Sequence, residues 1–128
     1  MSLEKKMAEL IAIERDVRAF GFDWADLDMI VDQTISECEE VRSAKLDGES
    51  KERLQEEVGD VIHSAVSLCL YCGFDVEETV GMVTEKFSKR VEALKLVMQK
   101  HEITDLRNQP VEFLNQLWLE AKKISDKN

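Results

Sequence analysis

Two pairs of acidic residues stand on either side of a short polar break in this chain. Glu37 and Glu40 form the first pair, and Glu57 and Asp60 form the second. Residues three positions apart are neighbours on one face of a helix, so each pair would place two carboxylates together. Two such helices joined by a tight turn would gather four negative charges, which is costly unless a cation neutralises them. The spacing therefore indicates a divalent-metal site.

A donor set made only of carboxylate oxygens favours a hard cation. Mg2+ fits because it takes a few carboxylates and completes its octahedron with waters and substrate phosphates, and Mn2+ could replace it. Neither a histidine nor a thiolate belongs to the set, which argues against zinc. Four carboxylates exceed the charge of one ion, so we expect more than one metal per site. The periodicity leaves a plain solvated acidic face as the open alternative.

Other metal-binding or redox patterns are weaker. His63 follows Asp60 by three positions, but helical di-iron proteins use two Glu-x-x-His elements, and His101 has no such partner. We expect His63 at the surface or at an interface. Cys69 and Cys72 have the spacing of a redox motif without a second pair, and the chain has three cysteines. Free cysteine behaves as a small hydrophobe, so we expect buried thiols in the core.

The elements that must position these residues are helices. One proline and five glycines, with many Glu, Lys, Leu and Ala, favour helix over sheet. Ser50 is a suitable N-cap, and Gly21 and Gly73 are suitable helix stops. The apolar rhythm predicts five helices, over residues 3–19, 26–46, 51–72, 75–101 and from 110 onward.

The acid pairs fall at matching borders of the apolar stripes of the second and third helices. Antiparallel packing of these helices, over residues 26–46 and 51–72, could bring the pairs face to face. We expect a compact all-α bundle of four to five helices that forms one domain over residues 1–128. The residues expected to face inward on the second helix are Leu27, Ile30, Val31, Cys38, Val41 and Ala44.

Charge and composition exclude several partners. The formal net charge of −10 argues against attraction to nucleic acid polymers or anionic membranes. The chain has no apolar run long enough for a membrane span, and its first residues lack the apolar core of a signal peptide. We therefore expect a cytoplasmic protein.

The order of the acid pairs resembles the defining motif of the MazG-like nucleotide pyrophosphohydrolases, part of the all-α nucleoside triphosphate pyrophosphatase superfamily. Residues 85–90 (Glu-Lys-Phe-Ser-Lys-Arg) are similar to that family's Glu-Lys-Phe-x-x-Arg segment, and residues 117–122 (Leu-Trp-Leu-Glu-Ala-Lys) to its C-terminal Leu-Trp-x-x-x-Lys segment. The resemblance covers about residues 22–122. Thr84 stands where many members have asparagine, and residues 22–26 echo the family's Pro-Trp-Asp region only loosely. The resemblance therefore leaves the base specificity open.

The resemblance implies a hydrolase that cleaves a nucleoside triphosphate between the α and β phosphates, giving a monophosphate and pyrophosphate. Bound metals would polarise the α-phosphoryl oxygen and lower the pKa of the attacking water. Glu37, Glu40, Glu57 and Asp60 would hold the metals, and Glu37 or Glu40 could take the proton of the water. Such an enzyme would remove non-standard or excess nucleotides.

The resemblance also implies residues that bind substrate. Lys86 and Arg90, four apart, would meet the β and γ phosphates, although this spacing alone fits a solvated basic face equally. Trp118 could stack a base while Lys122 meets a phosphate, and a core tryptophan is the alternative. Trp24 is a second candidate for the base pocket.

Two other functions stay open at this point. Phosphoribosyl-ATP hydrolysis belongs to the same superfamily, and a non-catalytic acidic helical module that binds a protein partner would need no metal. Wide apolar stripes, together with the resemblance, imply a core shared between subunits in a homodimer or a dimer of dimers. Lys86, Trp118 or Lys122 could then complete the site of a neighbouring subunit.

Overall fold

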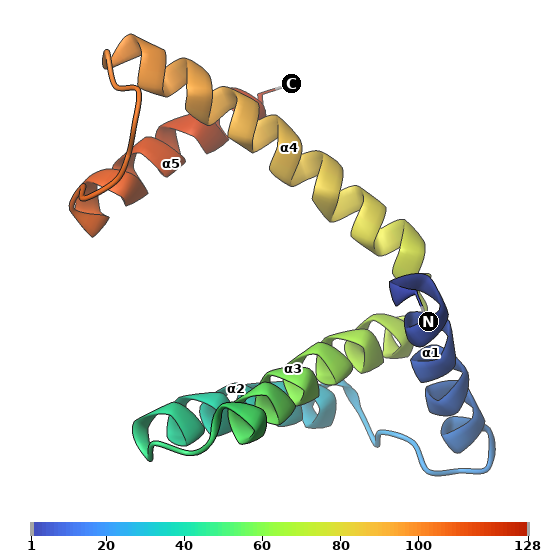
Figure 1. Cartoon of the computed structure of the whole chain (residues 1–128). Coiled ribbons are helices and arrows are strands. Elements are labelled where there is room, and N and C mark those ends of the chain that lie inside the picture. The colour runs from blue at the N-terminus through green and yellow to red at the C-terminus, as the bar shows by residue number, and fades with distance from the viewer. Residues whose placement is uncertain (1, 128) are drawn as a thin grey trace. The chain divides into compact units, whose positions relative to one another are not determined.

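The computed structural model describes residues 2–127, and within them it contains five helices and no strand. The all-α prediction is confirmed. The helices are α1 (Leu3–Ala19), α2 (Leu27–Leu46), α3 (Lys51–Tyr71), α4 (Val76–Lys100) and α5 (Val111–Ser125), as Figure 1 shows. No helix in residues 2–127 combines the length and apolar character that crossing a membrane would require.

Local capping chemistry sets the helix ends. Side-chain oxygens of Ser2, Asp26 and Ser50 accept hydrogen bonds from the backbone N–H three residues further on, at 3.2, 2.8 and 3.2 Å. These contacts satisfy donors that have no partner inside the helix. Gly21 and Gly73 follow the first and third helices with φ angles of 102° and 82°, a conformation that favours glycine. The predicted cap and stops are confirmed.

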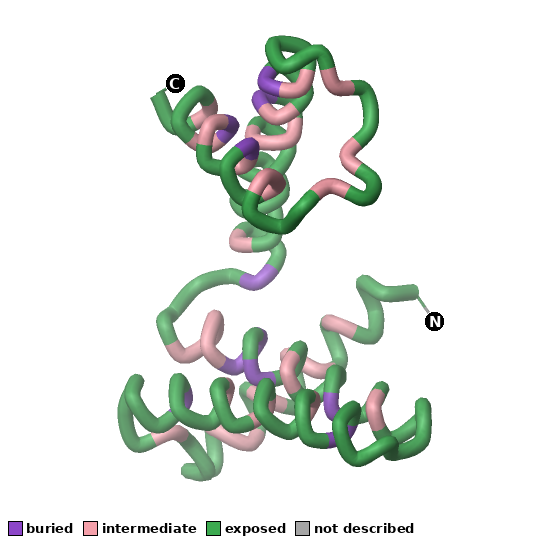
Figure 2. The backbone as a smooth tube through the Cα atoms, turned by 90° about the vertical axis from the view of Figure 1, so that its left-hand side faces the viewer, coloured by how far each residue is buried: buried purple, intermediate pink, exposed green. Residues whose placement is uncertain are grey.

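The chain divides into two compact units, and the first, Met1–Val76, contains α1, α2 and α3. α2 and α3 lie side by side as an antiparallel hairpin, and α1 packs against α3 (Figure 1). Few positions are fully buried, as the purple segments of Figure 2 show. The buried residues of α2 and α3 are Ile30, Ala44, Glu57, Ser64, Val66 and Ser67.

The second unit, Glu77–Asn128, consists of most of α4, the connecting loop and α5. The rings of Phe87 and Trp118 lie 6.1 Å apart between their centroids, and His101 Nε2 lies 3.2 Å from Glu120 Oε2. These contacts link α5 to α4 and to the residue that follows α4. The buried apolar residues of this hairpin are Ala93, Val97, Leu117 and Ala121.

The predicted inward face of α2 is only partly right. Ile30 and Ala44 are 0% and 3% exposed, but Leu27, Val31 and Cys38 are exposed. Within the first unit α2 packs against α3, so only one side of the helix is covered.

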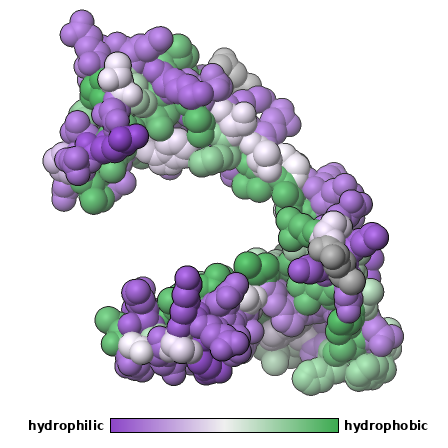
Figure 3. Space-filling model, viewed as in Figure 1, coloured by the Kyte–Doolittle hydropathy of each residue, from purple (hydrophilic) through white to green (hydrophobic). Residues whose placement is uncertain are grey.

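The expectation of buried thiols is wrong for Cys38 and Cys72, which are exposed, while Cys69 is half-buried. Large apolar side chains are exposed in both units, and green surface atoms mark such regions in Figure 3.

Candidate metal centre and adjoining pocket

Three of the four predicted carboxylates come together between α2 and α3. One oxygen each of Glu37, Glu57 and Asp60 lie within 4.8 Å of one another. Glu57 is buried, with 9% of its surface exposed, whereas Asp60 is exposed. Glu40 is exposed and lies outside this three-residue group, which we call the acid cluster. The hairpin thus brings one acid of the first pair to both acids of the second.

The electrostatics of Glu57 indicate a negative charge that the protein compensates incompletely. Burial raises the pKa of Glu57, and Arg53, whose Nη2 lies 3.3 Å from Glu57 Oε1, opposes that rise. The charges of Asp60, Glu40 and Glu37 raise the pKa further, so that it lies above its usual value. A divalent cation among these oxygens would reverse the balance and favour the ionised form.

The surrounding side chains fit a hard cation. The acid cluster offers only carboxylate oxygens, which Mg2+ prefers. Two other acids of the motif lie outside the acid cluster and pair with arginines: Glu39 with Arg42 at 2.9 Å and Glu56 with Arg53 at 3.1 Å. The donor chemistry therefore agrees with a magnesium-type site.

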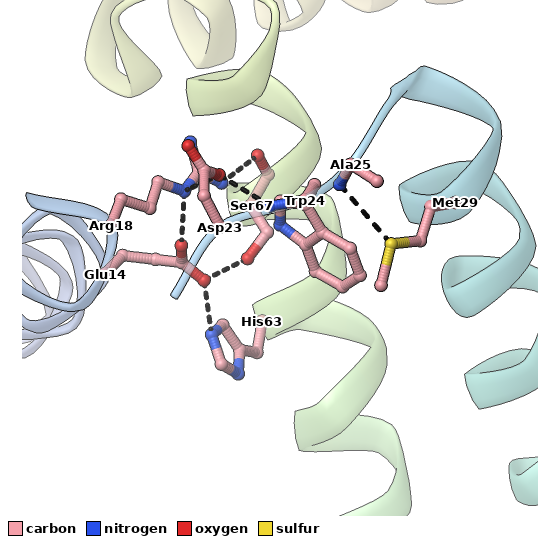
Figure 4. Close-up of polar contacts among 8 residues, drawn as sticks. All are labelled: Glu14, Arg18, Asp23, Trp24, Ala25, Met29, His63 and Ser67. Atoms are coloured by element: carbon pink, nitrogen blue, oxygen red, sulfur yellow. Dashed lines mark hydrogen bonds and ion pairs between the residues drawn. The ribbon is translucent and has the colours of Figure 1, made fainter. Parts of the chain in front are cut away.

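A polar network fastens α1 to α3 next to this cluster, and Figure 4 shows its members. Glu14 Oε1 accepts hydrogen bonds from His63 Nε2, at 2.9 Å, and from Ser67 Oγ. Arg18 Nε lies 3.0 Å from Glu14 Oε2, and Arg18 Nη2 donates to the backbone oxygen of Ser67 at 2.8 Å. The side chain of His63 is 51% exposed, in agreement with its expected surface position. The network fixes both the Glu14 carboxylate and the approach of α1.

The network also keeps Glu14 ionised. Burial raises the pKa of Glu14, but hydrogen bonds from Ser67 and His63 and the positive charge of Arg18 outweigh burial. The resulting pKa lies below its usual value of 4.5. An ionised carboxylate only accepts hydrogen bonds, so the proton in the contact with His63 belongs to the imidazole Nε2.

Two adjoining cavities connect the network to the acid cluster. The smaller, of about 200 Å3, is lined by Glu37 and Asp60 of the cluster and also by Glu14, Trp24 and His63. The larger, of about 520 Å3, shares the last three residues. A ligand could therefore extend from the acid cluster past the indole of Trp24 into the larger cavity.

The larger cavity, which we call the α1 pocket, is mostly apolar. Leu10, Ile13 and Val17 of α1 form one part of its lining, and Phe22 and Met29 form another. Such a lining with a few polar groups is typical of small-molecule sites. Of the two tryptophans proposed to meet a base, Trp24 is the one that lies beside the acid cluster within the first unit.

The remaining predicted residues belong to the second unit. Lys86 and Arg90 line one open hollow of about 600 Å3 together with Lys89, which supports their predicted placement on a common face. Arg90 Nη2 lies 3.4 Å from Asp126 Oδ2. Trp118 is half-buried against Phe87, and Lys122 is half-buried.

Two residues near the acid cluster, Gln33 and Glu14, were not predicted from the sequence. Gln33 Nε2 donates to Glu37 Oε1 at 2.6 Å and supports a cluster carboxylate. The four-residue spacing on one helix face could have identified this contact. Glu14 gave no comparable signal, because its partners His63 and Ser67 lie 49 and 53 residues away in the sequence.

The five helices and the acid cluster define the class of helical proteins with a site built from carboxylates. Comparison with known families identifies the family within this class. Residues 26–94, more than half of the chain, match the MazG nucleotide pyrophosphohydrolase domain. That segment contains both acid pairs. The chain belongs to this family, as its motif order had suggested.

Individual relatives agree with this membership. The chain is 29% identical over 110 residues to a nucleoside triphosphate pyrophosphohydrolase/pyrophosphatase MazG of Thermotoga maritima, covering 86% of this chain and 41% of that protein. It is 26% identical over 115 residues to a nucleoside triphosphate pyrophosphohydrolase of Escherichia coli K12, covering 87% and 42% respectively. The chain therefore spans about two fifths of the length of these relatives.

Proposed function

We propose that this chain is a divalent-metal-dependent nucleoside triphosphate pyrophosphohydrolase that releases a nucleoside monophosphate and pyrophosphate. The convergence of Glu37, Glu57 and Asp60 within 4.8 Å is the observation that carries this proposal. Family membership supports it, as do the names of the two relatives. Mg2+ is the proposed ion, more than one per site, and Mn2+ is its proposed substitute.

The residues of the first unit take distinct roles in this proposal. Glu37, Glu57 and Asp60 hold the metal, which when bound would polarise the α-phosphoryl oxygen and acidify the attacking water. Glu40 lies outside the three-residue group, so its carboxylate stays available to complete the coordination or to take the proton of the water. Glu37 is the alternative base. Trp24 provides an aromatic face for the nucleobase.

Positive side chains of the second unit are also proposed to bind substrate. Lys86 and Arg90 would neutralise the β and γ phosphates, and Lys122 would meet a further phosphate oxygen. Trp118 is the second aromatic candidate. These residues act either within one chain or across a subunit boundary.

A homodimer or a dimer of dimers is part of the proposal. Ile62 of α3 and Met82 and Phe87 of α4 are large apolar residues that are 53%, 67% and 60% exposed. A second copy of the chain would cover such surfaces. The proposed biological role is removal of non-standard or excess nucleotides.

Pyrophosphate release from a panel of ribo- and deoxyribonucleoside triphosphates, with and without Mg2+, tests the activity. We expect release only with the metal, and at least a hundredfold lower kcat/KM in Glu57→Gln. Glu39→Gln is the matched control, because Glu39 is exposed, pairs with Arg42 and lies outside the acid cluster.

The same panel decides between the alternatives. Phosphoribosyl-ATP is included as a substrate, and exclusive turnover of it would replace the proposed specificity. If neither the wild-type protein nor Glu57→Gln differs from buffer on any nucleotide, a non-catalytic helical module is the better description.

A further inference from the structure

Two of the polar side chains that edge the α1 pocket are carboxylates, which accept hydrogen bonds. Glu14 and Asp23 contribute carboxylates, and His63 donates from Nε2 to Glu14, which leaves the second ring nitrogen, Nδ1, outside this contact. In Figure 4 this second ring nitrogen lies on the side of His63 away from Glu14. Trp24, whose indole N–H is a hydrogen-bond donor, also lines the pocket. A ligand that offers N–H groups would complement this edge.

Glu14 is held rigidly enough to discriminate between ligands. Oε1 already receives two hydrogen bonds, from His63 and Ser67, while Oε2 faces the Arg18 guanidinium at 3.0 Å. A carboxylate has about four accepting directions, so Oε2 retains one. The side chain is 11% exposed, and it lines both the α1 pocket and the cavity beside the acid cluster. A ligand group bound there would contact the Glu14 carboxylate, which is a charged hydrogen-bond acceptor in a fixed position.

We propose that the α1 pocket holds the nucleobase of the substrate and that Glu14 selects bases with an exocyclic amino group over bases with a carbonyl in its place. This inference rests on the proposed function and specifies its substrate class. The 4-amino group of cytosine would donate a hydrogen bond to Glu14 Oε2. Uracil and thymine would instead place a carbonyl oxygen next to the carboxylate, and two acceptors form no hydrogen bond. The indole donor of Trp24 can meet a carbonyl of either pyrimidine and therefore does not discriminate.

The size and position of the pocket agree with this assignment. Its volume of about 520 Å3 accommodates a base with part of a sugar, and its aliphatic and aromatic lining suits the ring faces. Trp24 lies between the pocket and the cavity that contains Glu37 and Asp60. The phosphates of a nucleotide whose base enters the pocket would then point toward the acid cluster.

Calorimetric binding of dCMP and dUMP in the presence of Mg2+ tests the selection without requiring turnover. We expect the wild-type protein to bind dCMP at least about tenfold more tightly than dUMP. Such a ratio corresponds to the free energy of one hydrogen bond to a charged group. Glu14→Gln should reduce this ratio to about threefold or less, because an amide can also donate to the uracil carbonyl. Glu9→Gln, an exposed acid of the same helix that does not line the pocket, should keep the wild-type ratio.

A second variant covers the case in which Glu14→Gln disturbs the contact between α1 and α3. Ile13→Trp fills the α1 pocket from a position outside the polar network. It should weaken the binding of dCMP and dUMP alike by at least about tenfold, while Mg2+ raises its Tm as it raises that of the wild-type protein.

The outcomes separate this inference from the proposed function. Equal binding of dCMP and dUMP by the wild-type protein, an unchanged ratio in Glu14→Gln, or unaffected binding in Ile13→Trp would each overturn the assignment even if triphosphates are hydrolysed. Selective binding of dCMP without any triphosphate hydrolysis would support the pocket and overturn the proposed activity instead.

Discussion

Glu57 combines burial with three neighbouring negative charges, and both raise its pKa. A folded-state pKa above the unfolded value means that the native protein binds more protons in the interval between the two values. The contribution of Glu57 to the free energy of unfolding of the metal-free protein therefore decreases as the pH rises through that interval, from about 4.5 upward. A bound cation opposes this loss of stability, because it favours the ionised form of the Glu57 carboxylate.

The first prediction follows from this linkage. In the metal-free state at neutral pH, Glu57→Gln should have a higher Tm than the wild-type protein, because the amide carries no charge into the cluster. The same variant should lose most of the Tm increase that Mg2+ gives the wild-type protein. Thermal unfolding between pH 4 and pH 8, with chelator or with Mg2+, measures both effects. Glu39→Gln should behave as wild type, and a lower metal-free Tm in Glu57→Gln would contradict this account.

The pKa of Glu14 is shifted in the opposite direction from that of Glu57. Its folded-state pKa is lowered, so its contribution to stability is present above the unfolded value of 4.5 and is lost as the pH falls through the folded value. Glu14→Gln should therefore lower the Tm at pH 7, and the difference from wild type should shrink below pH 4.5. Glu9→Gln provides the control on the same helix. A Tm difference that is constant across this pH range would mean that packing, not charge, explains the effect.

At the scale of elements, the helix ends were predictable because capping is local. Ser50 accepts from a backbone N–H three residues away, and Gly73 adopts a positive φ, so a few neighbouring residues determine each boundary. The meeting of Glu37 with Glu57 and Asp60 was also predictable, because the helix period and a short turn constrain it. The contact of Glu14 with α3 was not, because it depends on how two separate helices cross.

Burial within the helices was less predictable than their existence. An apolar stripe shows which side of a helix avoids water but not which element covers it. Leu27 and Val31 continue the stripe of α2 and are nevertheless exposed. The same limit explains why Cys38, predicted to be a core thiol, lies at the surface.

The α4–α5 hairpin gives a test of packing within one element pair. Leu117 is 0% exposed on α5, whereas Leu119, two residues further on, is 55% exposed. Leu117→Ala should lower the free energy of unfolding by about 2–5 kcal/mol. Leu119→Ala should change it by about 0.5 kcal/mol or less in the monomer. Chemical denaturation of the two variants measures the difference, and equal losses would mean that Leu119 is buried in a subunit contact.

For the whole molecule, the exposed apolar surface is the main feature that the single chain does not explain. Ile62 lies on α3, two residues after Asp60 of the acid cluster, and is 53% exposed. Ile62→Glu should convert an oligomer to a smaller species, as measured by light scattering over a dilution series. Gln55→Glu, another exposed position on α3, adds the same charge and should leave the mass unchanged. A wild-type protein that is a stable, active monomer at all concentrations would exclude a shared core.

The oligomeric state bears on whether the proposed substrate-binding residues and the acid cluster of one site come from one chain or from two. Lys86, Arg90, Trp118 and Lys122 belong to one compact unit and the acid cluster to the other, so a single-domain description of the chain stays a prediction. Activity measured after mixing a Glu57→Gln protein with a Lys86→Ala protein would reveal sites built from two chains. Recovery above the sum of the separate activities is expected only for such shared sites.

The position of Trp24 gives the protein an internal optical reporter. The chain has two tryptophans, and Trp24 lines both the cavity beside the acid cluster and the α1 pocket. In a Trp118→Phe background its emission would therefore respond to ion binding on one side of the indole and to base stacking on the other. Stopped-flow fluorescence could then resolve the order in which metal and nucleotide arrive without any added dye.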